Sequence, residues 1–342
     1  MTTSMSTLAV LARCVGSEKF NVEFAEKCIT IGMQLVEAND DPDVRKCAYN
    51  LFGAVATIVK EDMSACMEPC VTLMLKSLQS TEGIHLEMSG ADSNLPLEEL
   101  DDEEDEINLE DASEEAEDLD DVKAIGVENA FVAEKEQALV ALKDFSLECG
   151  PAFFPFLDPC IEESWTMLDY PDDDVRGAAV LATAAFLTAY YKSGRPEGLK
   201  AFNTDTARFI PKLAEMVEEE SEHNVVVNSL DGITEMLKHC KQAVTALPGV
   251  PEKIVMCVTK IMKKECACQD QDDEEEGMEE EEEAEQDEML FEYAGEVLPN
   301  LGNISSSLVQ SQSGCHQYQL TCKNIFLGMA FNLNFFYYDD FN

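Results

Sequence analysis

The stretch from Gly150 to Tyr191 constrains the fold most, because it marks both ends of one complete structural unit. In its first half, apolar residues recur at steps of three and four, which places them on one face of a helix that starts behind Pro155. Those residues are Phe153, Leu157, Ile161, Trp165 and Leu168. The polar residues from Asp169 to Asp174 then form a turn and cap a second helix that begins near Val175. The stretch therefore predicts two antiparallel helices joined by a tight turn.

Such a hairpin cannot bury both of its apolar faces alone, so it requires similar units stacked beside it. The segment Asp41-Pro-Asp-Val-Arg45 closely parallels Asp172-Asp-Asp-Val-Arg176, which is an internal repeat at the start of two second helices. The starts of the expected second helices lie near Asp43, Asn129, Asp174, Glu222 and Glu288. Once two acidic inserts are subtracted, these starts recur at about 45 residues, the period of HEAT and armadillo repeats. The sequence predicts an all-α helical solenoid of the HEAT/armadillo type, with about five helix pairs and two long acidic loops.

This pattern also predicts three regions along the chain. Residues 1–16 are expected to form the second helix of a truncated repeat, and residues 17–303 the solenoid itself. Acidic inserts are expected at about 88–122 and 269–288 within the solenoid. Residues 304–342 break the helical pattern and are expected to be a disordered or aberrant tail outside the repeats.

The two acidic inserts contain the strongest concentration of charge. Glu98 to Asp121 holds 16 acidic residues in 24, Asp270 to Glu288 holds 14 in 19, and neither run contains a basic residue. Without these 30 acids the formal net charge would be −17 instead of −47, so most of the excess negative charge is confined to the two runs. Each run lies between the first and second helix of its own pair, which predicts that both project from one rim of the solenoid, roughly 30 Å apart.

Two such runs at equivalent positions favour capture of a highly basic protein segment, because many ion pairs that are weak singly add up to a salt-sensitive interaction. The alternative is that both runs only keep the chain soluble. The candidate cargo-binding residues are Glu98, Glu99, Asp101, Asp102, Glu103, Glu104, Asp105 and Glu106 in the first run, and Asp272, Asp273, Glu274, Glu275, Glu276, Glu279, Glu280, Glu281, Glu282 and Glu283 in the second. The repeat turns are marked by four residues, Asp43, Arg45, Asp174 and Arg176. The two arginines are expected to bridge acidic groups of adjacent repeats, with direct contact to cargo as the alternative.

Other functional classes are disfavoured. A nucleic-acid surface requires the opposite sign of charge. The 13 scattered cysteines, with no secretory signal, are expected to be reduced thiols in the cytosol or nucleus. No apolar run reaches the roughly 20 residues that span a membrane.

No catalytic, metal or cofactor site is expected either. Cys266 and Cys268, together with Cys315, His316 and Cys322, match no zinc spacing, and Asp270 to Glu274 lacks the glycine of a calcium loop. No catalytic triad surrounds His85, His223 or His239, and no phosphate-binding glycine loop occurs. Trp165 is expected in the core.

Several short motifs lie around the two acidic runs, namely Leu78 to Ile84, Val127 to Phe131, Glu134-Lys-Glu136, Ala267 to Asp270 and Glu292 to Glu296. With these motifs, the chain resembles the importin-β (karyopherin-β) family of nuclear transport receptors over about Thr7 to Asn303. The resemblance implies a HEAT-repeat receptor that shuttles between cytoplasm and nucleus and carries basic cargo, such as histones or ribosomal proteins, through the nuclear pore. It further implies pockets for phenylalanine-glycine nucleoporins and release of cargo by the Ran GTPase in its GTP form. The resemblance also implies that the main Ran-binding surface lies in N-terminal repeats of the family, which are not among the repeats expected in residues 17–303. The alternative function is a HEAT-repeat scaffold or acidic chaperone that holds basic proteins such as histones without Ran.

Overall fold

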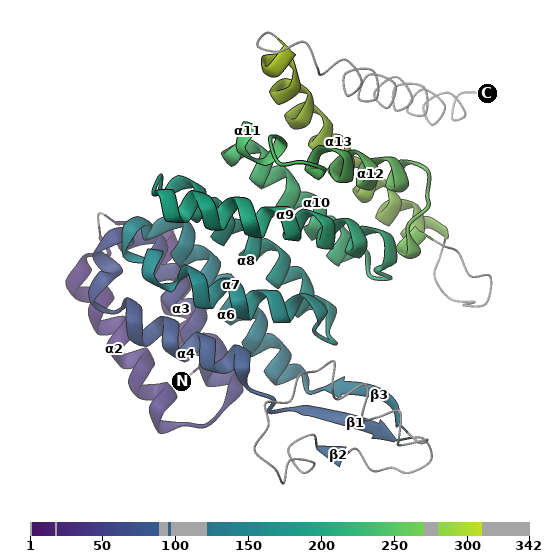
Figure 1. Ribbon diagram of the computed structural model, residues 1–342. Helices are drawn as coiled ribbons and strands as arrows, with labels where there is room; N and C mark the ends of the chain where they lie inside the picture. The colour runs from purple at the N-terminus through teal and green to yellow at the C-terminus, as the bar shows by residue number, and fades with distance from the viewer. Residues whose placement is uncertain (1, 18, 89–94, 97–121, 270–279, 310–342) are drawn as a thin grey trace, which may run out of the picture. The chain divides into compact units, whose positions relative to one another are not determined.

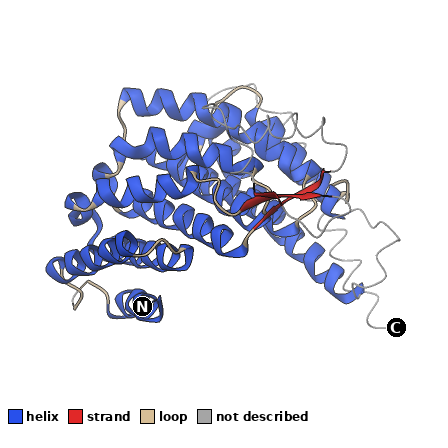
Figure 2. Cartoon of the chain, turned by 90° about the horizontal axis from the view of Figure 1, so that it is seen from below, coloured by secondary structure: helices blue, strands red, loops and turns tan. Residues whose placement is uncertain are grey.

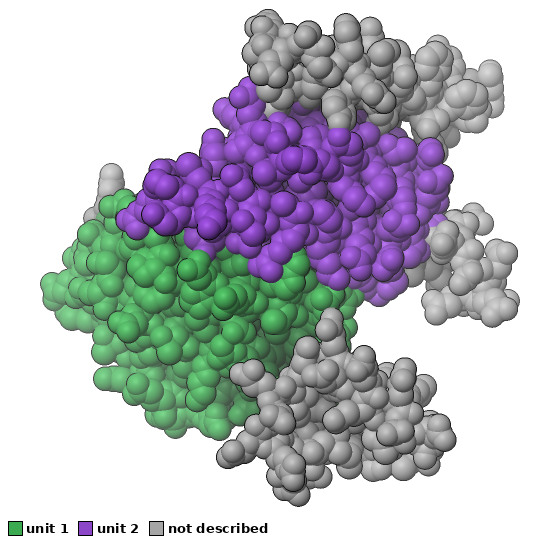
Figure 3. Space-filling view, viewed as in Figure 1, with its two compact units in different colours: residues 1–179 green, residues 180–342 purple. Residues whose placement is uncertain are grey.

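The computed structural model describes residues 2–17, 19–88, 95–96, 122–269 and 280–309. The chain divides into two compact units, residues 1–179 and residues 180–342 (Figure 3), and the boundary falls inside one helix, α8 (Asp173–Lys192). Helices dominate both units, and the only strands in the described ranges form one small ribbon in the first unit (Figure 2). No helix in these ranges is long and apolar enough to cross a membrane.

The first unit contains the stacked helices α1 (Thr2–Val15), α2 (Val22–Ala38), α3 (Pro42–Val59), α4 (Met67–Gln79), α6 (Asn129–Glu148) and α7 (Leu157–Thr166) (Figure 1). The helix α3 lies at its centre, with α1 on one side and α6 on the other. A Cβ added at Gly53 of α3 would lie 3.4 Å from the Cα of Ala141 in α6, so these two helices pack closely. Tyr49 and Phe52 of α3 are fully buried in this core.

The repeated aspartate turns act as helix caps. The Asp41 carboxylate accepts a hydrogen bond from the backbone N–H of Asp43 (2.9 Å), and Pro42 follows as the first residue of α3. In the later copy, Asp172 accepts a bond from the N–H of Asp174 (3.0 Å) at the start of α8. The internal repeat therefore encodes one local structure, a side-chain-capped helix start.

The second unit contains α9 (Pro196–Glu219), α10 (His223–Cys240), the short α11 (Gln242–Thr245), α12 (Val250–Met262) and α13 (Glu280–Val309), together with the end of α8. Gly232 of α10 allows close contact with α8, because an added Cβ would lie 3.4 Å from Val180 Cγ1. The core of this unit includes Phe209, Leu230 and Ile254, which are all fully buried.

Several expected elements differ from the structure. The helix expected behind Pro155 is α7, which starts at Leu157, but it is shorter than the expected apolar stripe. Two 3₁₀ turns, Gly150–Ala152 and Phe154–Phe156, precede α7 and a third, Met167–Asp169, follows it, so Phe153 and Leu168 lie outside the α-helix. Proline within the second turn removes a backbone donor there, which explains why the α-helix starts only at Leu157. Trp165 is half-buried rather than a core residue, whereas Cys160 and Ser164 of the same helix are fully buried.

The second acidic run was wrongly expected to be a loop throughout. Helix α13 begins at Glu280, eight residues before the start expected near Glu288. Glutamate has a high helix propensity, and acidic side chains in a first turn interact favourably with the helix dipole. The same helix continues past residue 304 to Val309, so the expected boundary of the C-terminal tail falls within a helix; residues 310–342 lie outside the described residues.

Candidate functional site

The first acidic insert leaves the helical stack through a β-ribbon that the sequence did not predict. Strand β1 (Ile84–Met88) follows α4, and β3 (Val122–Val127) leads directly into α6. These two strands pair antiparallel, with Ile84 opposite Val127 and Leu86 opposite Ile125, and the two-residue β2 (Leu95–Pro96) pairs with the other side of β1. Both ends of the insert are thus held side by side next to the helices (Figure 1).

Gly83 makes the bend into β1 possible. Its φ of +81° is a conformation that favours glycine, and a Cβ at this position would lie only 2.3 Å from the ring of Phe131 in α6. The Gly83 carbonyl accepts a hydrogen bond from the backbone N–H of Glu128 (3.0 Å), which joins the base of the ribbon to the start of α6.

Lys135 holds α6, at the base of the ribbon, against the end of α4. Its side chain is buried (2% exposed), and Nζ donates to the carbonyls of Ser77 (2.7 Å), Leu78 (3.0 Å) and Ser80 (2.6 Å) at the end of α4. These carbonyls are among those that a helix leaves unpaired at its C-terminus. Burial lowers the pKa of Lys135 to about 8, although the nearby charges of Glu134, Glu163 and Glu82 oppose that shift.

Arg45 connects the first repeat turn with this base through three carboxylates. Its Nε lies 2.7 Å from Glu134 Oε1, Nη1 lies 2.8 Å from Asp40 Oδ1, and Nη2 lies 3.4 Å from Glu82 Oε2. The Glu134 side chain is 4% exposed, whereas that of Asp40 is 91% exposed. Burial lowers the pKa of Arg45, but its hydrogen bond to Glu134 and the surrounding carboxylates outweigh burial and raise that pKa above its ordinary value. Lys135 and the Arg45 cluster together make the root of the first insert, defined here as Arg45, Glu82, Glu134 and Lys135.

The second insert has a comparable root. Lys264, which follows α12, pairs with Asp287 Oδ2 of α13 at 2.6 Å, and Gln269 Nε2 donates to Asp287 Oδ1 at 2.7 Å. The Asp287 side chain is 16% exposed. In both inserts, then, a charged residue on the helix after the insert is bonded to the end of the segment before it.

Of the expected carboxylates, Glu98 to Glu106 and Asp272 to Glu279 lie outside the described residues, as do Cys315, His316 and Cys322. Glu280 to Glu283 form the first turn of α13. Arg176 Nη1 donates to the carbonyls of Tyr170 and Pro171 (both 2.9 Å), in the turn that precedes its own helix. Cys266 and Cys268 are buried, and the described ranges contain no group of three residues that fits a metal ion.

The role of Lys135 was missed, although the sequence contained a signal for it. Lys135 lies three residues before Ala138 and four before Leu139, on the apolar stripe of its own helix. A lysine at a core position requires hydrogen-bond partners, because an unpaired buried charge is costly. Its partners are main-chain carbonyls, which no side-chain pattern reveals.

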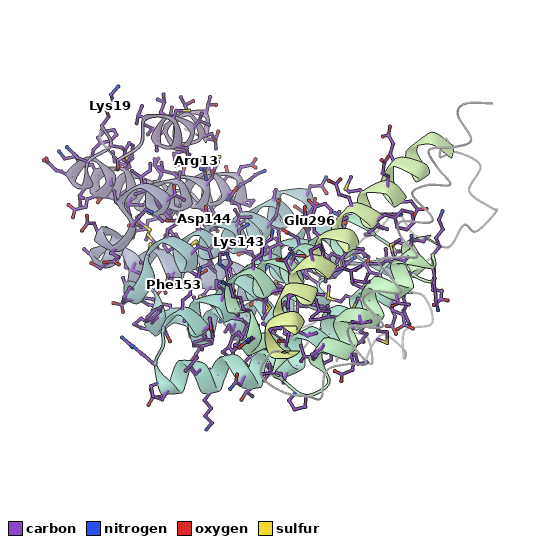
Figure 4. All side chains as sticks on the ribbon, turned by 90° about the horizontal axis from the view of Figure 1, so that it is seen from above. Arg13, Lys19, Lys143, Asp144, Phe153 and Glu296 are labelled. Atoms are coloured by element: carbon purple, nitrogen blue, oxygen red, sulfur yellow. The ribbon has the colours of Figure 1, made fainter. Side chains whose placement is uncertain are left out.

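The stacked second helices of the first unit also carry polar groups. Arg13 Nη1 of α1 donates to Asn50 Oδ1 of α3 at 2.9 Å, and Asp144 lies farther along on α6 (Figure 4). Burial raises the pKa of Asp144, against the lowering effect of Lys143 and Arg13.

The chain is similar in sequence to known proteins, although not to any family model. No family model matches the chain. Importin-4 from mouse is 35% identical over 304 residues, which cover 87% of this chain and 28% of the relative, and importin-4 from human is 36% identical over 302 residues with the same coverage. The chain belongs to the importin-β family. This importin-β chain spans about 28% of the length of those relatives.

Solved structures agree with the fold of this importin-β chain. The karyopherin Kap121p bound to Ste12p aligns with a TM-score of 0.56 at 16% identity, over 95% of this chain and 28% of that one. Structures of Kap121p bound to Nup53p and to RanGTP align with TM-scores of 0.53 and 0.54. The predicted HEAT-type helical solenoid is therefore confirmed as a class. Membership of a family of transport receptors also agrees with the expectation that the importin-β chain is not an enzyme.

Proposed function

We propose that this chain is the part of a nuclear import receptor that holds basic protein cargo, such as histones or ribosomal proteins, through its two acidic runs. The observation that carries the proposal is their placement: 30 carboxylates lie in two runs, each between the paired helices of an importin-β fold and each with a bonded root. One exposed ion pair contributes only about 0–1 kcal/mol and is screened within about 8 Å at physiological salt. Many of them acting together give fast, salt-sensitive capture.

In this proposal the receptor moves between cytoplasm and nucleus, contacts phenylalanine-glycine nucleoporins and releases its cargo to Ran in the GTP form. Kap121p has been solved bound to Nup53p and bound to RanGTP, which supports the same classes of partner here. The family relation supports transport more than retention in one compartment. A scaffold or acidic chaperone without Ran remains the alternative, and a pull-down of the full-length receptor with GTP-loaded Ran separates the two.

The test is binding of the chain to histone H3–H4 across a salt series. In the key variant, the acids of residues 98–121 and 270–279 are replaced by Asn and Gln, which keeps both lengths and leaves Asp287 in place. A control variant neutralises three exposed acids on the helices instead, Glu68, Glu162 and Glu219.

We expect tight binding that falls steeply with salt in the parent chain and in the control, and both weaker binding and a shallower salt dependence in the key variant. Unchanged affinity in that variant would refute a role of the runs. It would move the cargo site to the concave helices of the stack.

A further inference from the structure

The second unit has a group of exposed cations at one end of its helices. Lys192 lies in the last turn of α8, Arg195 is the N-cap of α9, Lys200 follows within α9, and Lys241 is the C-cap of α10. All four residues are exposed, and the acidic residue Glu197 lies among them. These four cations are called the basic patch, and they are unusual in a chain that has 70 acidic and 23 basic residues.

Contacts between the helices bring the basic patch together. The Cys240 thiol donates to Thr188 Oγ1 at 3.8 Å, so the last turns of α10 and α8 are adjacent. Burial raises the pKa of Cys240 to about 11, and the bond to Thr188 and the charge of Lys192 oppose that shift, which places Lys192 near the end of α10. A Cβ added at Gly198 would lie 3.0 Å from the carbonyl oxygen of Tyr190, so the first turn of α9 packs on the last turn of α8. The three helix ends therefore lie together.

The lysines of the basic patch have no ionic partner in the part of the chain that the structure describes. Within those ranges, the side chains of Lys192, Lys200 and Lys241 form no ion pair and no hydrogen bond. Lys238, one turn before the end of α10, pairs with Glu235 at 2.9 Å. With three acidic residues for every basic one, three exposed lysines without a carboxylate partner are available to an external anion.

The backbone of Lys241 gives a second indication that its side chain has a role. Lys241 has φ +49° and ψ −120°, a conformation that favours glycine. The residue with positive φ is Gly16 after α1 and Gly194 after α8. After α3 it is Lys60, whose Nζ pairs with Glu148 at 3.1 Å. Lys241 has no such bond within the described ranges, and strained positions of this kind are common at functional sites.

Helix stability explains only part of the charge. The helix dipole favours cations at C-termini, which accounts for a positive charge at Lys192 and Lys241. It favours anions at N-termini, yet Arg195 is the N-cap of α9 and its side chain forms no cap bond. A cation at that position requires another reason.

The surroundings of the basic patch favour a short protein segment as its ligand. Leu199 is 36% exposed beside Lys200, so a ligand meets an apolar side chain as well as cations. Helix α9 has 24 residues and is about 36 Å long, whereas charges are screened within about 8 Å at physiological salt. Glu218 and Glu219 at its other end therefore repel a long nucleic acid but not a short ligand. We propose that the basic patch binds a short segment of a partner protein that is rich in glutamate or aspartate, with an apolar side chain against Leu199.

This inference goes beyond the proposed function. The acidic runs are proposed to hold a basic cargo, whereas the basic patch takes a partner of the opposite charge. Because the two sites have opposite sign and use different residues, each can be tested without the other.

The probe is a fluorescently labelled peptide of about ten residues that alternates glutamate and serine and has one central leucine. Its binding to the full chain is measured by fluorescence anisotropy at several salt concentrations. The key variant is the triple substitution Lys192→Gln/Lys200→Gln/Lys241→Gln, which leaves the helix propensities nearly unchanged.

The matched control is Lys19→Gln/Lys27→Gln/Lys76→Gln. It removes three exposed lysines of the first unit, so both variants have the same net charge. Lys241→Arg keeps the cation and Lys241→Gly removes it, and glycine also relieves the backbone strain.

We expect the key variant to weaken peptide binding about tenfold or more, since each exposed ion pair contributes roughly two- to fivefold, and the control to stay within about twofold of the parent. Lys241→Gly is expected to weaken binding while it raises the urea midpoint, and Lys241→Arg to preserve binding. A loss of affinity together with a gain of stability separates a binding role from a structural one.

No binding of the peptide, or equal weakening in the key variant and the control, would overturn the inference. Tighter binding of a single-stranded oligonucleotide of the same charge, abolished in the key variant, would show a nucleic-acid surface and would also overturn it. Histone binding is expected to be unchanged in the key variant, so a failure of the peptide assay leaves the proposed function intact.

The reverse also holds. Loss of the proposed function in the histone assay leaves the peptide result valid, because the variant of the acidic runs keeps all four cations of the basic patch.

Discussion

Arg45 allows a sharp test of how the first insert is attached, through the variant Arg45→Met. The Glu134 side chain is 4% exposed, Arg45 Nε bonds its Oε1 at 2.7 Å, and its buried Oε2 has no hydrogen-bond partner in the described part of the chain. Removal of the cation leaves a buried carboxylate without its hydrogen-bonded partner, and breaking a buried pair in this way typically costs about 3–5 kcal/mol. The other two pairs of Arg45 contribute little, because Asp40 is 91% and Glu82 47% exposed. We therefore expect about 3–4 kcal/mol of destabilisation.

The measurement combines urea denaturation with native-state hydrogen exchange at the amides of α6, since a helical solenoid can open locally. Lys27→Met is the matched control, because Lys27 and Glu23 form a pair at 2.7 Å with side chains 63% and 77% exposed, and we expect a cost under about 0.5 kcal/mol there. The double variant Arg45→Met/Glu134→Gln should recover about 2 kcal/mol relative to Arg45→Met, because it removes the stranded charge. A loss below about 1 kcal/mol in Arg45→Met, or no recovery in the double variant, would refute the argument from burial.

Two further predictions concern the same region. Gly83→Ala should destabilise the first unit by about 2–4 kcal/mol, because it combines a positive φ with a Cβ 2.3 Å from the Phe131 ring. Gly16→Ala is the control, since Gly16 has a φ of +65° but no atom within 4 Å of an added Cβ, and it should cost only about 1 kcal/mol. Equal losses of stability in urea denaturation would contradict the steric explanation. The pKa of Lys135 is lowered to about 8 from 10.5, so between about pH 8 and pH 10.5 its amine binds fewer protons in the folded chain than in the unfolded chain. The free energy of unfolding should therefore rise with pH in that window, by up to about 1.4 kcal/mol per pH unit relative to Lys135→Met. Parallel stability curves for parent and variant would show that Lys135 is solvated.

The helical part of the fold follows from local patterns. Four predicted helix starts agree with the structure to within one residue, because each helix buries one apolar stripe against its neighbours. They are the starts of α3, α6, α8 and α10, which were predicted near Asp43, Asn129, Asp174 and Glu222. The aspartate turns were predictable for the same reason: a cap depends on residues within one turn, such as Asp41 and Asp43. The short helix α11 was not among the predicted elements.

The β-ribbon was not predictable. Strand β1 contains only five residues and β3 six, and they are separated by more than 30 residues of sequence that include the acidic run. The pairing of such strands depends on backbone hydrogen bonds and on helices that bring the strand ends together. Neither factor produces a recognisable pattern of residue types in the sequence. The start of α13 inside the second acidic run was missed because a run of glutamates fits a loop and a helix equally well until its neighbours are known.

The sequence by itself determined the all-α repeat architecture, the placement of two acidic runs between paired helices and the resemblance to importin-β receptors, because each of these depends on residue type and spacing alone. Only the tertiary structure decided how the inserts are attached. Lys135 contacts three main-chain carbonyls 55 to 58 residues away, and Arg45 contacts Glu134 across 89 residues. Contacts of that kind form only when the helices are packed together. Every residue carries the same main-chain carbonyl, so residue type does not show which carbonyl will accept a bond, and a buried charge meets its partner only in the folded stack.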